Sequence, residues 1–274
     1  MTLPLVQFAP ADAAALLELS ESIGWPHEAG DWQTTLAASQ VFGHRGSDGK
    51  ILSSSSIYQF GPTLAALAVV LVREEFRRQG LARAAVARCL DQVPGIPQML
   101  VATPFGQPLY ESLGFKITEQ IVRLVAAEGT SLPVTGEIKP MTDADLPQVF
   151  ELDRAIYQAD RSQVLRHRWA QAAGGVMLRD GTGYAWKIPQ RGGLVLGPVV
   201  ASSPQDAANL VAHLTAGFRG RIKIEIPERH IELMTILTSA GFIVDSSRPL
   251  MLKNVEKLPG QRELLFGLAS LGFC

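Results

Sequence analysis

The segment LVREEFRRQGLARAAVARCL, residues 71–90, places five arginines around one glycine, where an apolar stretch gives way to helical spacing. A helix N-terminus exposes unpaired N–H groups with partial positive charge, and a glycine there lets an anion approach the backbone. Cationic side chains at that end of a helix are unfavourable without an anion. These residue types predict an anion site that suits a pyrophosphate; the alternative is a solvated basic first turn.

A strand and a helix must position this segment. Three strand-like pieces precede it, VFGHRG, KILSSSSIYQF and TLAALAVVLV, and a helix is predicted from about Gln79 to Asp91. QMLVATP then reads as a short strand, GQPLYESLG as a short helix and FKITEQIVRLVA as two strand segments. Alternating helices and strands of these lengths indicate an α/β fold with a mixed sheet.

The predicted order of elements runs twice along the chain, on either side of a Gly, Pro, Ser and Thr rich linker at 127–137. The matching helix ends YESLGF and LTSAGF place Gly114 and Gly241 127 positions apart (241 − 114). We therefore predict two copies of one fold, residues 1–130 and 136–274.

Two motifs in order resemble a known family. VREEFRRQGLA resembles the acetyl-CoA-binding segment of the GCN5-related N-acetyltransferases (GNAT), in which an Arg/Gln-x-x-Gly-x-Gly/Ala turn leads from a strand into a helix; Arg77, Gly80 and Ala82 match its key positions. ATPFGQPLYESLGFK resembles a second family segment, which ends in Leu-Tyr-x-x-x-Gly-Phe. WPHEAGDW, ADRSQVLRHRW and LGPVVASSPQDA resemble tandem members with an intact N-terminal and a divergent C-terminal half, so the resemblance covers essentially the whole chain.

The resemblance implies two tandem GNAT folds, acetyl-CoA as cosubstrate and no metal. Backbone groups of Leu71 and Val72 would hold the acetyl carbonyl and the pantetheine arm, and amides from Arg78 to Arg83 would hold the pyrophosphate. The expected cofactor-binding residues are Leu71, Val72, Arg77, Arg78, Gln79, Gly80, Leu81, Ala82 and Arg83. Tyr110 would protonate the departing thiolate of CoA; the alternative is a core residue of a short amphipathic helix.

The second copy lacks these residues at the offset of 127. That offset places Arg77 on Pro204, Gln79 on Asp206, Gly80 on Ala207, Ala82 on Asn209 and Tyr110 on Leu237. A carboxylate repels phosphate, proline has no N–H, and leucine has no proton to give. We therefore predict that the C-terminal copy is degenerate and does not bind acetyl-CoA.

The base that takes the proton of an acceptor amine is not a fixed residue in the family. The loop GWPHEAGDW offers His27, Glu28 and Asp31, flanked by two tryptophans, and in this fold that loop usually borders the acceptor site. The alternative is that Asp31 caps a helix beginning at Trp32.

Other polar residues give weaker signals. Glu74 and Glu75 follow the strand and are further candidates for the base, or solvated. Two of the four serines at 53–56 could face an acceptor pocket, because side chains alternate along a strand. The other histidines (His44, His167, His213 and His230) have no metal-type spacing and read as surface or structural residues. Cys89 reads as a buried thiol on an apolar helix face.

The composition limits the classes of protein to which the chain can belong. The chain has 274 residues, 47% hydrophobic and 19% charged, with 25 basic and 26 acidic residues, which predicts a packed core and argues against a nucleic-acid-coating protein. Two distant cysteines need no disulfide framework, and no signal peptide or stretch of about 18 apolar residues is found. We expect a cytoplasmic protein with no membrane or nucleic-acid partner, and leave open whether it is a monomer or a homodimer.

These observations predict an N-acetyltransferase that moves an acetyl group from acetyl-CoA to a primary amine of a small molecule by direct attack, with Tyr110 as general acid. Two alternatives remain at this point. One is a non-catalytic acyl-CoA-binding sensor or partner protein. The other is an enzyme that acetylates proteins, for which an open cleft would be expected.

Overall fold

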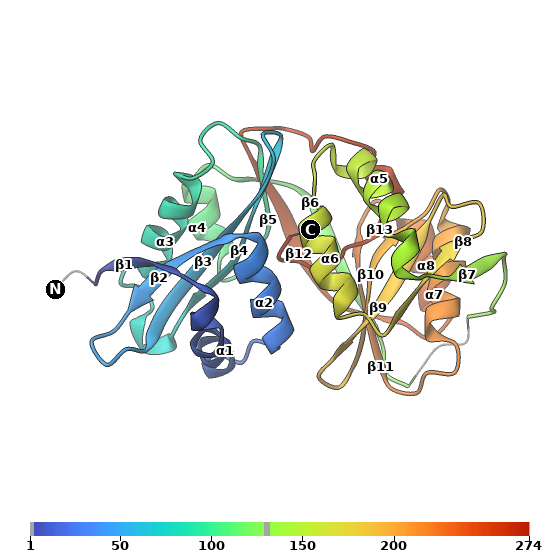
Figure 1. Cartoon of the computed structure of the whole chain (residues 1–274), viewed down its shortest axis with the longest axis horizontal. Helices are drawn as coiled ribbons and strands as arrows, with labels where there is room; N and C mark the ends of the chain where they lie inside the picture. Colours follow the sequence, from blue (N-terminus) through green and yellow to red (C-terminus); the bar gives the residue numbers. More distant parts are fainter. Residues whose placement is uncertain (1–2, 129–131, 274) are drawn as a thin grey trace. The chain divides into compact units, whose positions relative to one another are not determined.

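The computed structural model describes residues 3–128 and 132–273. The chain divides into two compact units (Figure 1). Unit 1 comprises residues 1–100 with 253–255 and 273, and unit 2 comprises residues 101–252 with 256–272 and 274, each as far as it is described. The linker predicted at 127–137 includes residues 129–131, which lie outside the described residues, so the boundary at 130–136 stays a prediction.

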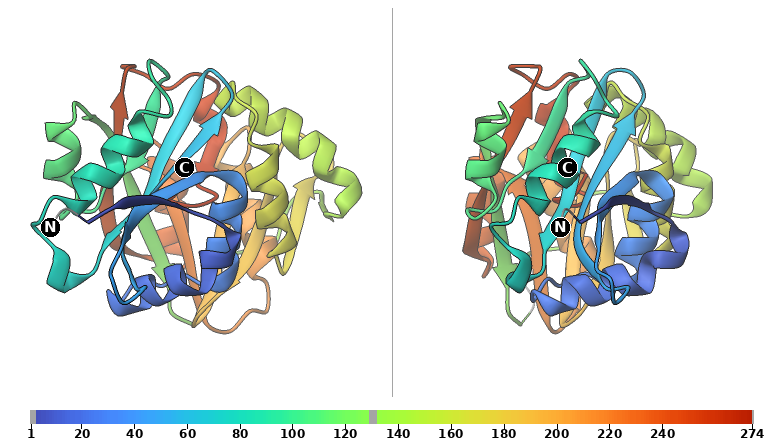
Figure 2. Two further views of the ribbon diagram at one scale, coloured as in Figure 1. Left: turned by 60° about the vertical axis from the view of Figure 1, so that its left-hand side comes forward. Right: turned by 90° about the vertical axis from the view of Figure 1, so that its left-hand side faces the viewer.

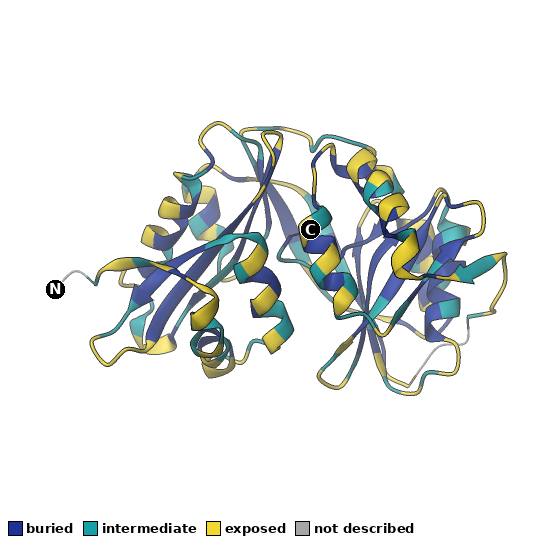
Figure 3. Ribbon diagram, in the orientation of Figure 1, coloured by how far each residue is buried: buried dark blue, intermediate teal, exposed yellow. Residues whose placement is uncertain are grey.

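Unit 1 is a sheet covered by helices. Its elements are β1 (Leu5–Phe8), α1 (Ala13–Ser22), α2 (Ala29–Ala38), β2 (Gln40–Arg45), β3 (Ile51–Phe60), β4 (Leu64–Val72), α3 (Leu81–Leu90) and β5 (Gln98–Val101), whose last residue belongs to unit 2. Strands β1 to β4 pair antiparallel in chain order, and β5 is parallel to β4. Helices α1 and α2 lie on one face of this sheet and α3 on the other (Figure 2). Strands β3 and β4 are therefore buried along most of their length (Figure 3).

Local backbone chemistry moves two predicted helix starts. The helix predicted from Gln79 begins at Leu81, because Arg78 (φ 60°) and Gly80 (φ 84°) adopt left-handed conformations that a helix cannot continue. The helix expected from Trp32 begins at Ala29, and Asp31 caps it from its third position.

Unit 2 contains the remaining elements. They are α4 (Gln107–Ser112), β6 (Lys116–Ala126), β7 (Ile138–Pro140), α5 (Leu146–Tyr157), α6 (Ser162–Ala170), β8 (Gly174–Leu178), β9 (Tyr184–Gln190), β10 (Gly193–Val200), α7 (Pro204–Thr215), β11 (Arg221–Pro227), α8 (Ile231–Ser239), β12 (Ile243–Lys253) and β13 (Leu265–Gly267). The strand order is β12-β6-β11-β10-β9-β8-β7, with β13 paired to β10. FKITEQIVRLVA, predicted as two strands, is mainly one continuous strand, β6, that pairs on both sides.

The duplication is visible in hydrogen bonds. The N–H of Phe115 donates to the Tyr110 carbonyl oxygen, and the N–H of Phe242 donates to that of Leu237, so both helices end in the same way 127 residues apart (242 − 115). Strands β6 and β12, the equivalent strands of the two copies, pair antiparallel, and Ile121 lies opposite Arg248, again 127 residues on.

The C-terminal strand β13 lies beside β10 and reaches β11. Val199 of β10 is the partner of Gly267, and the N–H of Leu268 donates to the carbonyl oxygen of Glu225 on β11 (2.9 Å). A Cβ built on Gly197 of β10 would lie 2.0 Å from the carbonyl oxygen of Leu268, so the two backbones are in close contact. The C-terminal segment therefore occupies the space where β10 and β11 part.

None of the helices in the described ranges is both long and apolar enough to span a membrane.

Substitution of Gly197 tests this packing. Gly197→Ala places a methyl group against the Leu268 carbonyl, whereas Gly192→Ala adds one at another positive φ where no atom lies within 4 Å. We expect Gly192→Ala to lower the free energy of unfolding by about 1 kcal/mol through backbone strain. Gly197→Ala is expected to cost roughly 1–3 kcal/mol more, because overpacking adds to the strain. Urea unfolding of both variants measures the difference, and equal losses would contradict the close packing of β13.

Candidate active site

Strand β4 carries a bulge in unit 1. Between Ser54 and Ser56 of β3 the register shifts, so that Val69 and Val70 together oppose Ser55. Val69 has a φ of 50°, which is a rare conformation for a β-branched residue. Such a conformation costs of order 1–3 kcal/mol and persists only where its surroundings enforce it.

Two of the four consecutive serines enforce the bulge. The hydroxyl of Ser54 donates to the carbonyl oxygen of Val69 (2.9 Å), and that of Ser56 donates to the carbonyl oxygen of Ala68 (3.1 Å). Both serines are fully buried. The expectation that serine hydroxyls face an acceptor pocket is not what these contacts show, because the bulge takes up both.

The other two serines bind side chains. Ser55 accepts a hydrogen bond from the thiol of Cys89 on α3 (3.3 Å), and Ser53 bonds Nδ1 of His44 (2.7 Å). Cys89 is fully buried, as predicted, and burial raises the pKa of its thiol to about 12, so the thiol stays protonated. It therefore has no thiolate for nucleophilic chemistry.

Among the described residues, β5 pairs parallel with β4 at Ala65 and Ala66, near the start of β4, and no pairing with β5 is found further along. Just beyond the other end of β4, the N–H of Arg73 donates to the carbonyl oxygen of Leu52 on β3 (2.9 Å). Backbone groups alternate along a strand, so those of Val72 point away from β3. They can bind an extended ligand that lies along β4.

The loop 73–80 forms a concave run of amides. Arg78 and Gly80 are left-handed, and Gly80 is the N-cap of α3. Alternating conformations of this kind turn successive N–H groups toward one point, and the first turn of α3 adds N–H groups that have no intrahelical acceptor. A Cβ on Gly80 would meet no atom within 4 Å, so the approach to these amides is open. The arrangement suits a diphosphate.

The arginines of the loop and of the first turn of α3 differ in their contacts. Arg77 makes an ion pair with Glu74 (3.0 Å), whereas the side chains of Arg78 and Arg83 are exposed. Glu74 and Glu75 are exposed as well, which fits solvated residues.

The second copy has no counterpart of this loop. Strand β10 ends at Val200 and α7 begins at Pro204, so residues 201–203 stand where unit 1 has 73–80. The N-caps Gly80 and Ser203 are 123 residues apart (203 − 80), so the residue-by-residue correspondence at 127 is wrong across this loop. The second copy therefore lacks the residues that form this run of amides, rather than carrying different residues at the same positions.

The N-terminus of α7 is closed by its own side chains. Ser203 accepts a hydrogen bond from the N–H of Asp206 (3.1 Å), as a helix cap should, and its hydroxyl donates to the Asp206 carboxylate (2.6 Å). Strand β10 has its own bulge, at Gly197 and Pro198, where Pro198 has no N–H and β13 covers the strand. The N–H of Asp206 and the edge of β10 beside β13 are therefore taken up within the chain.

Tyr110 lies on α4 in unit 2. Its side chain is 8% exposed and its ring packs edge-on against Phe115. Burial raises the pKa of the phenol well above its usual value, so the hydroxyl is protonated at neutral pH and has a proton to donate. Its counterpart Leu237 is fully buried in an apolar cluster.

The α1–α2 loop holds His27 between two indole rings. The ring centroid of His27 lies 5.4 Å from that of Trp25 and 5.7 Å from that of Trp32. Nδ1 of His27 bonds the hydroxyl of Ser20 (2.9 Å). Asp31 accepts a hydrogen bond from the N–H of Glu28 (2.9 Å). It closes a capping box from the third position of α2, whereas the alternative interpretation placed it before a helix that begins at Trp32. Ser20 gave no signal in the sequence, because it lies on the preceding helix among ordinary helical residues.

Three of the remaining histidines have structural partners. His44 bonds Ser53, His213 bonds the carbonyl oxygen of Asn209 (2.9 Å), and Nε2 of His230 bonds that of Leu265 (2.9 Å). Within residues 3–128 and 132–273, no group of three His, Cys, Asp or Glu side chains is placed to hold a metal ion.

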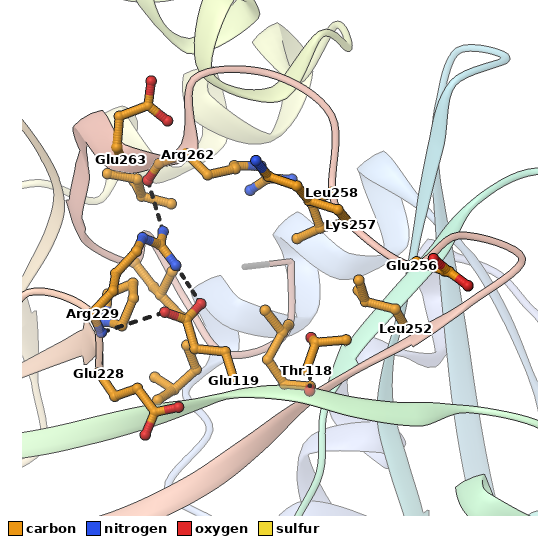
Figure 4. Close-up of a pocket in the computed structure, with 15 residues that line it drawn as sticks. Thr118, Glu119, Glu228, Arg229, Leu252, Glu256, Lys257, Leu258, Arg262 and Glu263 are labelled. Carbon is orange, nitrogen blue, oxygen red and sulfur yellow. Dashed lines mark hydrogen bonds and ion pairs between the residues drawn. The ribbon is translucent and has the colours of Figure 1, made fainter.

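A cavity of about 490 Å³ lies in unit 2, between β6, β12 and the segment 256–268 (Figure 4). Arg229 on its wall makes an ion pair with Glu119 and donates to the carbonyl oxygen of Arg262. The carboxylates of Glu256 and Glu263 point away from the interior in Figure 4. Arg229 and Glu119 therefore pair with each other, and the carboxylates of Glu256 and Glu263 are turned outward.

Comparison with known proteins identifies both copies. The model of the acetyltransferase (GNAT) family matches residues 13–115, and that of an acetyltransferase (GNAT) domain matches residues 149–267. The chain belongs to the GNAT acetyltransferases, with two GNAT domains in tandem. The uncharacterized N-acetyltransferase YitH of Bacillus subtilis (strain 168) is 28% identical over 275 residues, which cover 97% of this chain and 96% of that protein.

Solved structures share the fold of this GNAT protein. A putative acetyltransferase from Pyrococcus horikoshii aligns with a TM-score of 0.82 and 18% identity, over 99% of this chain and 96% of that chain. A tandem GNAT protein from the clavulanic acid biosynthesis pathway aligns with a TM-score of 0.63 and 15% identity, over 92% and 98% of the two chains. At these identities the likeness supports the fold alone.

Removal of the serine hydroxyls tests the bulge. Ser54→Ala with Ser56→Ala removes the hydroxyl donors that bind the carbonyl oxygens of Val69 and Ala68, and each lost hydrogen bond costs about 1 kcal/mol. Tyr58→Phe on the same strand is the control, because it removes a buried hydrogen bond to Thr35 (2.9 Å) and leaves the bulge intact. We expect both proteins to lose stability in urea unfolding, and only the serine variant to lose affinity for acetyl-CoA. Equal affinities would show that the bulge is not part of the binding site.

Proposed function

We propose that this GNAT protein transfers an acetyl group from acetyl-CoA to a primary amine of a small molecule, and that only the first copy binds the cosubstrate. The observation that carries the proposal is the contrast between the copies. Unit 1 has the amide run at 78–82 and an open edge at Val72, whereas the second copy has residues 201–203 and β13 in the corresponding places. The pyrophosphate of CoA suits the amide run, and the pantetheine arm suits the edge of β4.

The reaction proceeds by direct attack. The neutral amine nitrogen attacks the thioester carbonyl carbon, a C–N bond forms and the C–S bond breaks. The leaving thiolate needs a proton, which we assign to Tyr110. Burial keeps the pKa of this phenol high, so the acid form is available through neutral pH, and no loss of the acid is expected until pH is well above 10. We also propose that the acceptor amine is a small molecule. Whether the protein acts as a monomer or as a homodimer is left open here, as in the sequence analysis.

Gly80 is the position that tests cosubstrate binding most cleanly. Gly80→Ala adds a methyl group where a phosphate would approach, and Gly49→Ala is a matched control, because both glycines have a φ of 84° and open space around the added atom. Loss of one charge-assisted hydrogen bond costs about 1.5–3 kcal/mol, which is about 10–100-fold in Kd. Calorimetric titration should show this loss for Gly80→Ala and an unchanged Kd for Gly49→Ala. Similar affinities would contradict the placement of the pyrophosphate.

Tyr110 separates an enzyme from an acyl-CoA sensor, which is the second candidate function. Tyr110→Phe should reduce kcat about 100-fold or more and leave the Kd of acetyl-CoA unchanged, because a general acid acts only on the leaving group. Release of the CoA thiol measures turnover with polyamines, amino acids, aminoglycosides and peptides as acceptors. Tight acetyl-CoA binding without turnover of any amine would favour the sensor, and turnover of peptides alone would favour protein acetylation.

A further inference from the structure

His27 is held in one orientation by α1 and α2. Two indole rings contact its imidazole, and Nδ1 bonds the hydroxyl of Ser20. That hydroxyl is fully buried and also accepts a hydrogen bond from Nε1 of Trp32 (2.9 Å). No other residue in the described ranges bonds Nε2 of His27. The ring is therefore positioned by one nitrogen, and the other is available.

The hydrogen bonds of Ser20 assign the proton on the ring. Ser20 has one proton, and the carbonyl oxygen of Leu16 lies 3.3 Å from its oxygen as an acceptor. If Ser20 donates to Leu16, its two lone pairs accept from Trp32 and from Nδ1–H of His27, and every group of this buried hydroxyl is satisfied. Nε2 then carries a lone pair in the neutral ring. The same bonds persist when Nε2 takes up a proton, so the network accepts both states of the ring.

Charge and burial act on the ring in opposite directions. Burial lowers the pKa of His27, and the carboxylate of Asp31 on α2 raises it by a smaller amount. The neighbours from α1, Ser20 and Leu16, are uncharged. His27 is therefore neutral at physiological pH, while Asp31 stabilises the imidazolium formed when the ring takes a proton.

The tryptophans that contact His27 share a hydrophobic cluster with residues of the β4 bulge. Trp32 and Leu71 are members of one buried cluster in unit 1, and Trp25 and Val69 pack against it. The residues that hold His27 and the residues that shape the end of β4 are therefore parts of one packed body.

We propose that His27 is the general base of the acetyl transfer, with Nε2 taking the proton of the acceptor ammonium and Ser20 as a positioning residue. The inference rests on the proposed function. His27 removes one proton from the ammonium, and the neutral amine attacks the thioester carbon. The C–S bond breaks, Tyr110 protonates the thiolate, and the second proton of the nitrogen restores Tyr110. The sum is an amide, free CoA and one proton, which leaves His27 to solvent.

The pH dependence of kcat/KM tests the proposal, with the amine that gives the highest turnover in the panel above. Wild type should lose activity at low pH as His27 becomes protonated. His27→Gln should lower kcat/KM about 100-fold or more and remove this acid limb, with the Kd of acetyl-CoA unchanged. His167→Gln, in unit 2, is the control and should behave as wild type.

Asp31→Asn provides a second variant that does not depend on the loss of the imidazole. Its amide oxygen can still accept from Glu28, so the cap of α2 is kept while the charge is lost. Because Asp31 raises the pKa of His27, the acid limb should move to lower pH. The assignment would be overturned if kcat/KM fell at the same low pH in both variants as in the wild type. Loss of acetyl-CoA binding in His27→Gln would overturn it as well. Absence of acetyl-CoA binding by the wild type would instead refute the proposed function itself.

Discussion

The bulge of β4 is the constraint on which the rest of unit 1 depends. A β-branched residue, Val69, is held at a φ of 50°, and buried hydroxyls of the neighbouring strand bind the carbonyl oxygens on either side of the strain. The bulge shifts the register of β4, so the backbone groups of Val72 face away from β3 beyond the point where pairing with β5 is recorded. The strand leads from there into the loop 73–80. Backbone strain, the placement of the serines and the orientation of the Val72 backbone groups are thus one feature.

The second copy shows what the same fold becomes when that edge is not used. Strand β10 also bulges, at Gly197 and Pro198, but the chain itself supplies β13 along the strand, and α7 is capped by Ser203. The N–H of Asp206 bonds Ser203 and β13 pairs with β10, so these backbone groups are satisfied within the chain. Its strand β6 comes from the first copy and pairs with β12, so the two copies are joined by their own equivalent strands.

The local features were predictable from sequence, and the non-local ones were not. The Gly80 turn and the three strands before it follow from residue types at short range, and the structure confirms them. The bulge of β4 could not be predicted from the sequence, because a run of valines and alanines has the pattern of any buried strand. The shortened loop at 201–203 was missed because a fixed offset assumes that no residues are deleted, and the site of β13 depends on contacts with strands about 40 to 70 residues earlier. The Ser20–His27 bond joins two helices across a loop, which spacing alone does not reveal.

The central claim is that one copy binds acetyl-CoA and the other is closed by its own chain. A crystal structure of the full chain grown with saturating CoA tests it most directly. We expect CoA to be bound once per chain, with its pyrophosphate on the amides between Arg78 and Ala82 and its pantetheine arm along β4 near Val72. CoA between β10 and β11 with β13 displaced, or an empty loop at 73–80, would contradict it.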